Sequence, residues 1–133
     1  MTDNPFTLKK ITDVRGSIIA LEEGREIPFP VRRCYYIYDT KPDQPRGAHA
    51  HKALEQICIC VHGSCDIVLD DGKSKTEIRM DDPATGVYVG PMMWREMRNF
   101  SNDCVFLVLA SLPYDENDYI RNYDEFIKRA KGK

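Results

Sequence analysis

The sequence has no long hydrophobic run, little net charge and only three histidines, and the first two shortages each exclude a class of function. No apolar stretch approaches the roughly 18 residues of a transmembrane helix, and the first ten residues lack the apolar segment of a signal peptide. The net charge is −2, and the basic side chains are mostly scattered. Nucleic acids and anionic membranes attract concentrated positive charge, so we expect neither as a partner. We predict a cytoplasmic protein.

The five cysteines do not have the spacing of a zinc site. Cys58 and Cys60 form one Cys-x-Cys pair, but no second pair follows at a zinc-finger distance. The number of cysteines is odd, and three of them lie in apolar, strand-like stretches. We interpret them as buried, reduced thiols of a protein in a reducing compartment.

What the chain does contain is a regular alternation of short apolar runs and turn signals. Its 133 residues, 42% hydrophobic and 30% charged, suit one globular domain spanning residues 1–133. So many short strands predict an all-β fold, a sandwich or barrel. Residues 122–131 instead have acids early and bases late and are followed by Gly132, which predicts a short C-terminal helix over 122–131. The predicted strands are 17–22, 33–39, 55–61, 64–69, 75–80, 86–89, 94–100 and 105–110.

The segment around the first two histidines carries the most chemical information. In an extended strand, residues two apart point the same way and are about 7 Å apart, so His49 and His51 share a face. Glu55 continues that face if the strand stays regular so far. Two imidazoles and a carboxylate that converge can bind a divalent metal or transfer protons.

The region that would complete a metal site favours proton transfer over metal binding. The spacing of His49, His51 and Glu55 resembles the first cupin motif, and a second motif normally supplies another histidine. Here no histidine follows Pro91. We therefore expect no metal and no other cofactor. Two alternatives stay open: a metal-dependent cupin that also uses Glu96, and a non-catalytic sugar-nucleotide-binding module.

Five segments in order then resemble the sugar 3,4-ketoisomerases, the WxcM-like cupins that act on dTDP-4-keto-6-deoxyglucose. The resemblance runs from Asp13 to Phe126. It implies a cupin jelly-roll barrel, a homodimer and a dTDP-linked keto sugar as substrate, in pathways to 3-amino-3,6-dideoxy sugars of surface polysaccharides. The segments are residues 46–56 (RGAHAHKALEQ), 62–65 (HGSC), 70–73 (DDGK), 90–97 (GPMMWREM) and 114–126 (YDENDYIRNYDEF).

Moving a carbonyl from C4 to C3 through an enediol requires a group that takes and returns a proton near neutral pH. Histidine suits this task. We assign the proton shuttle to His51, as the resemblance also implies, and expect His49 to polarise the sugar oxygens and Tyr35 to donate to the enediolate. We expect the nucleotide and sugar to be bound by Arg15, Arg46, Arg95, Trp94 and Glu55. Whether Arg15 acts in its own subunit or in the partner subunit stays open.

Overall fold

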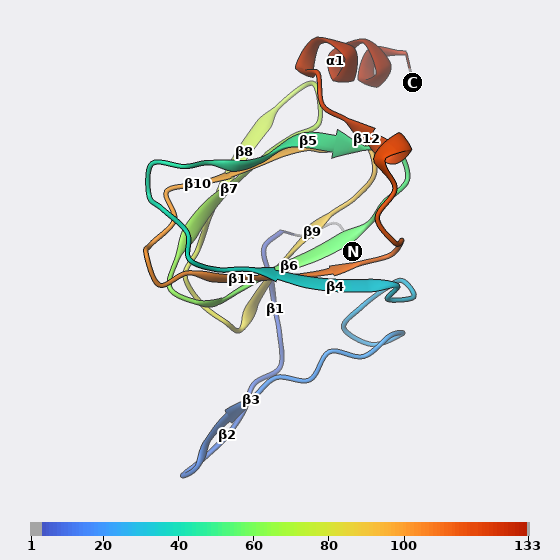
Figure 1. The fold of residues 1–133 in the computed structure, drawn as a ribbon. Coiled ribbons are helices and arrows are strands. Elements are labelled where there is room, and N and C mark those ends of the chain that lie inside the picture. Colours follow the sequence, from blue (N-terminus) through green and yellow to red (C-terminus); the bar gives the residue numbers. More distant parts are fainter. Residues whose placement is uncertain (1–3, 133) are drawn as a thin grey trace.

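Two five-stranded antiparallel sheets face each other and form the body of the protein (Figure 1). The structure is a computed structural model and describes residues 4–132. One sheet has the order β1-β9-β6-β11-β4 and the other β12-β5-β10-β7-β8. No helix in the described range is long and apolar enough to cross a membrane. The strands are β1 (Phe6–Thr7), β2 (Ile11–Asp13), β3 (Gly16–Ile18), β4 (Arg33–Ile37), β5 (Arg46–His51), β6 (Gln56–His62), β7 (Cys65–Asp70), β8 (Lys75–Met80), β9 (Thr85–Val89), β10 (Trp94–Arg98), β11 (Val105–Ala110) and β12 (Tyr119–Ile120).

The main core lies between the two sheets. Ile67 of β7, Val87 of β9 and Phe106 of β11 are fully buried there and belong to one continuous cluster. Alternate residues of a strand point to the same face, so each sheet contributes its inward row to this cluster. The predicted all-β fold is confirmed.

A tight turn carries the chain from one sheet to the other between β6 and β7. Gly63 has a φ of 71°, which disfavours a side chain. A Cβ there would lie 2.8 Å from the Cα of Cys104, so the turn at the end of β6 packs directly against the one before β11. The predicted turn at 70–72 is likewise present between β7 and β8.

The chain ends in one helix, α1 (Tyr123–Lys131), within one residue of the predicted bounds. The Asn122 side chain accepts a hydrogen bond from the amide of Glu125, which caps the first turn. Phe126 is fully buried. A 3-10 turn, η1 (Glu116–Asp118), and β12 precede the helix, and neither was predicted.

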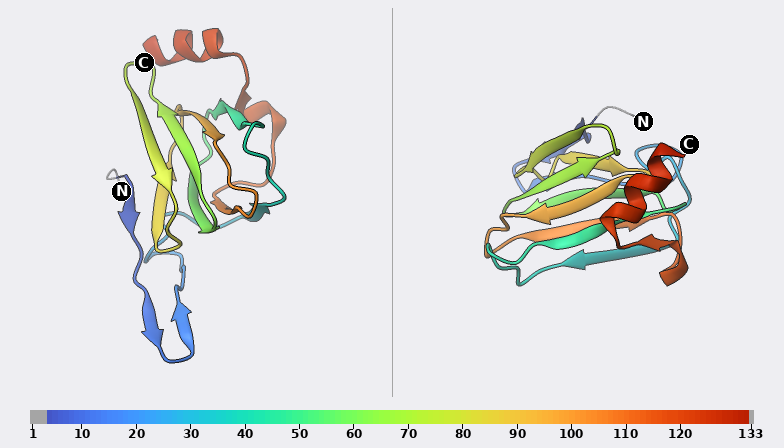
Figure 2. Two further views of the ribbon diagram at one scale, coloured as in Figure 1. Left: turned by 90° about the vertical axis from the view of Figure 1, so that its left-hand side faces the viewer. Right: turned by 90° about the horizontal axis from the view of Figure 1, so that it is seen from above.

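The predicted strand over 17–22 is wrong in its extent. β3 ends at Ile18 and pairs only with β2, in a separate two-stranded hairpin. This hairpin projects from the body at the end opposite α1 (Figures 1 and 2). Among residues 4–132 no third strand pairs with it, so residues 19–22 have no sheet to extend.

Candidate active site

The two histidines lie side by side at the end of β5. Their ring centroids are 4.8 Å apart and the rings meet edge to face. β5 lies between β10 and β12 in its sheet, and Arg95 of β10 pairs with His49 while Tyr119 of β12 pairs with His51. The predicted extended segment around the histidines is therefore confirmed, and its neighbours bring further polar groups to them.

Tyr119 covers the two histidines from the β12 side. Its ring centroid is 4.3 Å from that of His51 and 4.9 Å from that of His49. As a result the side chain of His51 is only 2% exposed, whereas His49 lines a pocket that opens to solvent. Sequence reasoning placed Tyr119 in a matching segment but gave it no role, because nothing local indicates that it pairs with a strand 68 residues earlier.

Asp118 holds the other side of the His51 ring. Its Oδ2 lies 3.1 Å from Nδ1 of His51. The same carboxylate accepts hydrogen bonds from the main-chain amides of Ala53 (2.9 Å) and Leu54 (3.2 Å). A carboxylate at Nδ1 fixes the proton of the neutral ring on that nitrogen and leaves Nε2 as the free base.

Both histidines are held in the neutral form. Burial lowers the pKa of His51 to about 3, and the charges of Arg95 and Arg33 act in the same direction. Burial also lowers the pKa of His49 to about 3, followed by the effect of Arg95. A neutral imidazole is the form that can accept a proton, so both rings are available as bases at neutral pH.

A hydrogen-bonded chain links the buried Arg95 to Tyr35 on β4. The Arg95 guanidinium donates to the side-chain oxygen of Gln56 and to the main-chain oxygen of Met93. The Gln56 amide in turn donates to the Tyr35 hydroxyl at 3.1 Å. Because that hydroxyl accepts from Gln56, its own proton remains free to be donated. Burial raises the pKa of Tyr35 to about 12, so the phenol keeps its proton at neutral pH.

A pocket of about 460 Å³ adjoins these groups, and positive charge surrounds it. Its wall includes Arg33, Arg46 and Arg121, together with His49, Tyr119 and Tyr35. The Arg121 guanidinium lies 4.1 Å from the centre of the Tyr119 ring, within the range of a cation–π contact. Three guanidinium groups around one cavity suit an anion such as a pyrophosphate.

The structure brings some of the predicted residues together and leaves others apart. His49, His51, Tyr35 and Arg95 form one cluster, and Arg46 lines the pocket. Arg95, which we expected to bind the substrate, is only 2% exposed and lies beside the histidines.

Glu55 does not continue the face of the histidines, which corrects the expectation. β5 ends at His51, and the loop before β6 turns the chain. The Glu55 side chain acts instead on Tyr88, whose pKa is raised by burial and then by this carboxylate. The neighbouring Gln56, 4% exposed, is the residue that reaches the site, and sequence reasoning missed it.

Two other predicted residues lie outside the cluster. Trp94 packs against Tyr123 and Phe126, with ring centroids 5.2 Å and 5.7 Å away, under α1. Arg95 and Trp94 are adjacent in β10, so their side chains point to opposite faces. Arg15 lies on the exposed turn of the β2–β3 hairpin, where it pairs with Asp13 at 2.6 Å.

The side chains that a metal-dependent cupin would use here do not come together in the described residues. Glu96 lies 3.9 Å from Arg98 in an ion pair, and Glu55 is turned away from the histidines. Within residues 4–132, the one group of three or more possible ligands with mutually close donor atoms is formed by cysteines, away from this site. The histidine pair is therefore better suited to proton transfer than to binding a metal together with Glu55 and Glu96.

Fold and site together define a two-sheet β protein with a closely packed pair of histidines beside a cationic pocket. Comparison with known proteins identifies a family with this kind of fold. Residues 3–131 match the FdtA family, described as WxcM-like, C-terminal. The chain is 56% identical over 128 residues to the TDP-4-oxo-6-deoxy-alpha-D-glucose-3,4-oxoisomerase of Aneurinibacillus thermoaerophilus, covering 96% of this chain and 92% of that protein.

Solved structures give the same result. A 3,4-ketoisomerase from Helicobacter canadensis is 55% identical, with a TM-score of 0.94 and 96% of each chain covered. A ketoisomerase from Thermoanaerobacterium thermosaccharolyticum, solved as a histidine-to-asparagine mutant in complex with TDP-4-keto-6-deoxyglucose, is 44% identical, with a TM-score of 0.94 over 97% of this chain and 94% of that chain. The chain belongs to the FdtA family of WxcM-like proteins.

Proposed function

We propose that this protein is a 3,4-ketoisomerase that converts TDP-4-keto-6-deoxyglucose to the corresponding 3-keto sugar. The observation that carries the proposal is the pair of neutral histidines, His51 buried and His49 half-buried, beside a pocket with three arginines. The identity of 56% to a TDP-4-oxo-6-deoxyglucose 3,4-oxoisomerase supports the choice of substrate.

The reaction is an internal transfer of hydrogen. The carbonyl at C4 acidifies the hydrogen on C3, and a base removes it to give an enediolate. A proton returned to C4, with a proton moved between the two oxygens, leaves the carbonyl at C3. The chain must supply a base, a proton donor to the oxygens and groups that stabilise the negative charge.

His51 is the base in this proposal. Its Nε2 is unprotonated because Asp118 holds the proton on Nδ1. The ring of Tyr119 lies over His51, so the sugar reaches Nε2 when this ring turns aside. Tyr119 stands on a strand of only two residues, which gives it few main-chain restraints.

Charge on the enediolate oxygens is stabilised by donors from the other strands. Tyr35 offers a phenolic proton, and the hydrogen bond it accepts from Gln56 orients the group. His49 lines the pocket and moves protons between the two sugar oxygens. The buried charge of Arg95 favours an anion at this position, because low-dielectric surroundings strengthen its field.

The pyrophosphate is bound by Arg33, Arg46 and Arg121. Their guanidinium groups share one pocket, and the Nε of Arg33 is buried without a hydrogen-bond partner in the described residues. A buried donor without a partner costs free energy, which a phosphate oxygen would recover. In this proposal Trp94 packs against α1 and makes no contact with the nucleotide.

A homodimer is the second part of the proposal. The β2–β3 hairpin exposes Ile11, Val14 and Ile18, and Tyr36 of the outer strand β4 and Tyr38 just after it are exposed as well. Exposed apolar side chains on a projecting hairpin and an unpaired sheet edge suit a second copy of the chain, and would deliver Arg15 to the partner's pocket. Light scattering at micromolar concentration tests this, since a monomeric mass excludes it.

The activity itself is tested with purified, EDTA-treated protein and TDP-4-keto-6-deoxyglucose, followed by proton NMR. We expect a 3-keto product without added metal, and the coupling at C4 reports its configuration. Binding of TDP without turnover, with or without divalent metal, would leave only a nucleotide-binding module.

A further inference from the structure

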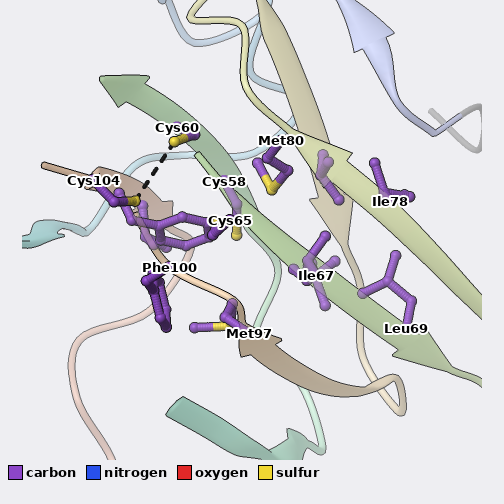
Figure 3. Close-up of a cluster of buried hydrophobic side chains, with 14 residues drawn as sticks. Cys58, Cys60, Cys65, Ile67, Leu69, Ile78, Met80, Met97, Phe100 and Cys104 are labelled. Carbon is purple, nitrogen blue, oxygen red and sulfur yellow. Dashed lines mark hydrogen bonds between the residues drawn. The ribbon is translucent and has the colours of Figure 1, made fainter. Parts of the chain in front are cut away.

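Three buried thiols meet at the end of the body where β6 leads into β7 (Figure 3). The sulfur atoms of Cys60, Cys65 and Cys104 lie within 4.8 Å of one another, and each residue is at most 1% exposed. Cys60 and Cys104 come from the sheet that contains β11, and Cys65 begins β7 in the opposite sheet. The isomerisation uses none of them.

Two of the three are close enough to react with each other. The sulfur atoms of Cys60 and Cys104 are 3.6 Å apart, the contact drawn as a dashed line in Figure 3. A disulfide has an S–S bond of about 2.05 Å, so the sulfurs need to approach by about 1.5 Å. Cys60 lies in β6 and Cys104 just before β11, and these strands are paired, so the backbones are already adjacent.

The cluster also favours a thiolate on one particular sulfur. Hydrogen bonds from Cys65, and then from Cys104, lower the pKa of Cys60 to about 7 against the opposing effect of burial. Burial raises the pKa of Cys104 to about 12, and the hydrogen bond to Cys60 raises that of Cys65. Cys60 contacts both other thiols, and its Sγ donates to the main-chain oxygen of His62 at 3.2 Å, so loss of this one proton gives a thiolate with two thiol donors beside it. We therefore assign the role of nucleophile to Cys60.

The surroundings favour a neutral product over a bound metal. Three thiolates around a divalent ion leave one net negative charge, within a cluster that includes Met80, Phe100 and Phe106. Burial of that charge in apolar surroundings is costly. A disulfide carries no charge and adds no atoms.

We propose that Cys60 and Cys104 form a peroxide-reactive pair that closes to a disulfide within the folded chain. The Cys60 thiolate attacks one oxygen of hydrogen peroxide, the O–O bond breaks, and a sulfenic acid and hydroxide result. The Cys104 sulfur then attacks the Cys60 sulfur, and the S–O bond breaks. The Cys104 proton leaves with the departing hydroxide as water. Overall, two thiols are oxidised by two electrons and one peroxide is reduced to two waters.

Burial makes the pair selective for a small oxidant. The closely packed turns at Gly63 and Ser101 cover the sulfurs, so a disulfide as large as glutathione cannot make direct contact. Cys65 is a positioning residue here, because its thiol stabilises the Cys60 thiolate without joining the new bond.

The test uses the full chain with Cys34→Ser, which removes the one exposed thiol among the five. The folded protein is treated with hydrogen peroxide, alkylated in denaturant and analysed by mass spectrometry. We expect a loss of two hydrogens per chain and a peptide crosslinked between Cys60 and Cys104. Adding Cys104→Ser should stop the reaction at a sulfenic acid on Cys60, which dimedone traps when it is added together with the denaturant. Adding Cys58→Ala, a buried thiol outside the group, should leave the crosslink unchanged.

Several results would overturn the proposal. One is a full set of alkylated thiols after peroxide treatment of the folded protein. Another is oxidation at a rate that follows global unfolding in denaturant, because the thiols then react only when exposed. A crosslink mainly between Cys60 and Cys65, or retention of Zn²⁺ that protects all three thiols from peroxide, would likewise contradict it. None of these results bears on the isomerase activity.

Discussion

The carboxylate of Asp118 lies 3.1 Å from Nδ1 of His51 and also caps the main-chain amides of Ala53 and Leu54. One side chain therefore ties the end of η1 to the loop after β5 and fixes the proton of the candidate base. This arrangement gives the first prediction. In Asp118→Asn the amide donates to Nδ1 and moves the ring proton to Nε2, the nitrogen that must accept a proton. We expect kcat to fall on the order of 10²- to 10⁴-fold.

The same variant also loses an acceptor for two amides, so its stability needs a control. Asp115→Asn changes a carboxylate that caps η1 without touching His51. It should keep kcat close to that of the unaltered protein. Equal losses of kcat in the two variants would show that Asp118 acts only by holding the loop.

The second prediction concerns pH. The base must be unprotonated to work, and the pKa of His51 is lowered to about 3 by burial. An ordinary histidine would lose this form below a pH of about 6.5, but a lowered pKa preserves it in more acidic solution. We expect kcat/KM, which reports the free enzyme, to stay nearly level between about pH 7 and pH 5.5. Loss of half of kcat/KM near pH 6.5 would contradict a buried, neutral base. The matched control is His62→Asn, which replaces an exposed histidine and should leave the pH profile unchanged.

The third prediction separates charge from shape at Arg95. After burial, Arg95 is the next contributor to the low pKa of both histidines. Arg95→Met removes this charge, so both pKa values should rise and the acid limb of kcat/KM should move to higher pH. Loss of the donor to Gln56 should also lower the free energy of unfolding by about 1–3 kcal/mol in urea titration.

Arg95→Lys keeps the charge and should keep the acid limb closer to its original position. An acid limb that does not move in Arg95→Met would show that the guanidinium does not act on the histidines.

The fourth prediction concerns Trp94, which we first expected at the nucleotide. It packs against Phe126 and Tyr123 beneath α1. Trp94→Phe should therefore lower the free energy of unfolding by about 1–2 kcal/mol, through lost packing, and leave KM unchanged. Urea unfolding and steady-state kinetics measure the two effects. A raised KM with unchanged stability would return Trp94 to the binding site.

The local sequence pattern was sufficient to predict most of the fold. Alternating apolar runs and glycine turns located most strands of the two sheets but missed β1 and β12, and Asn122 and Gly132 bounded the helix. The strand predicted over 17–22 failed because its length depended on a neighbouring strand, and the hairpin offers only β2.

The sequence predicted only those parts of the candidate site whose residues lie close to one another in the chain. His49 and His51 share a strand, so their common face follows from a period of two. Asp118 and Tyr119 reach the histidines through pairing of β12 with β5, and no local signal encodes that contact. Glu55 was misplaced because the chain turns after His51, which brought Gln56 inward in its place.

The central claim is that His51 carries the proton that leaves C3. The most direct measurement incubates the protein with TDP-4-keto-6-deoxyglucose in D₂O and follows by NMR the loss of the C3 proton of the substrate and the deuterium at C4 of the product. It compares the unaltered chain with His51→Asn and with His62→Asn, a variant of the exposed histidine. The account predicts rapid exchange and a 3-keto product in the unaltered chain and in His62→Asn, and loss of both in His51→Asn. Exchange at the original rate in a folded His51→Asn protein would contradict it and assign the base to another residue.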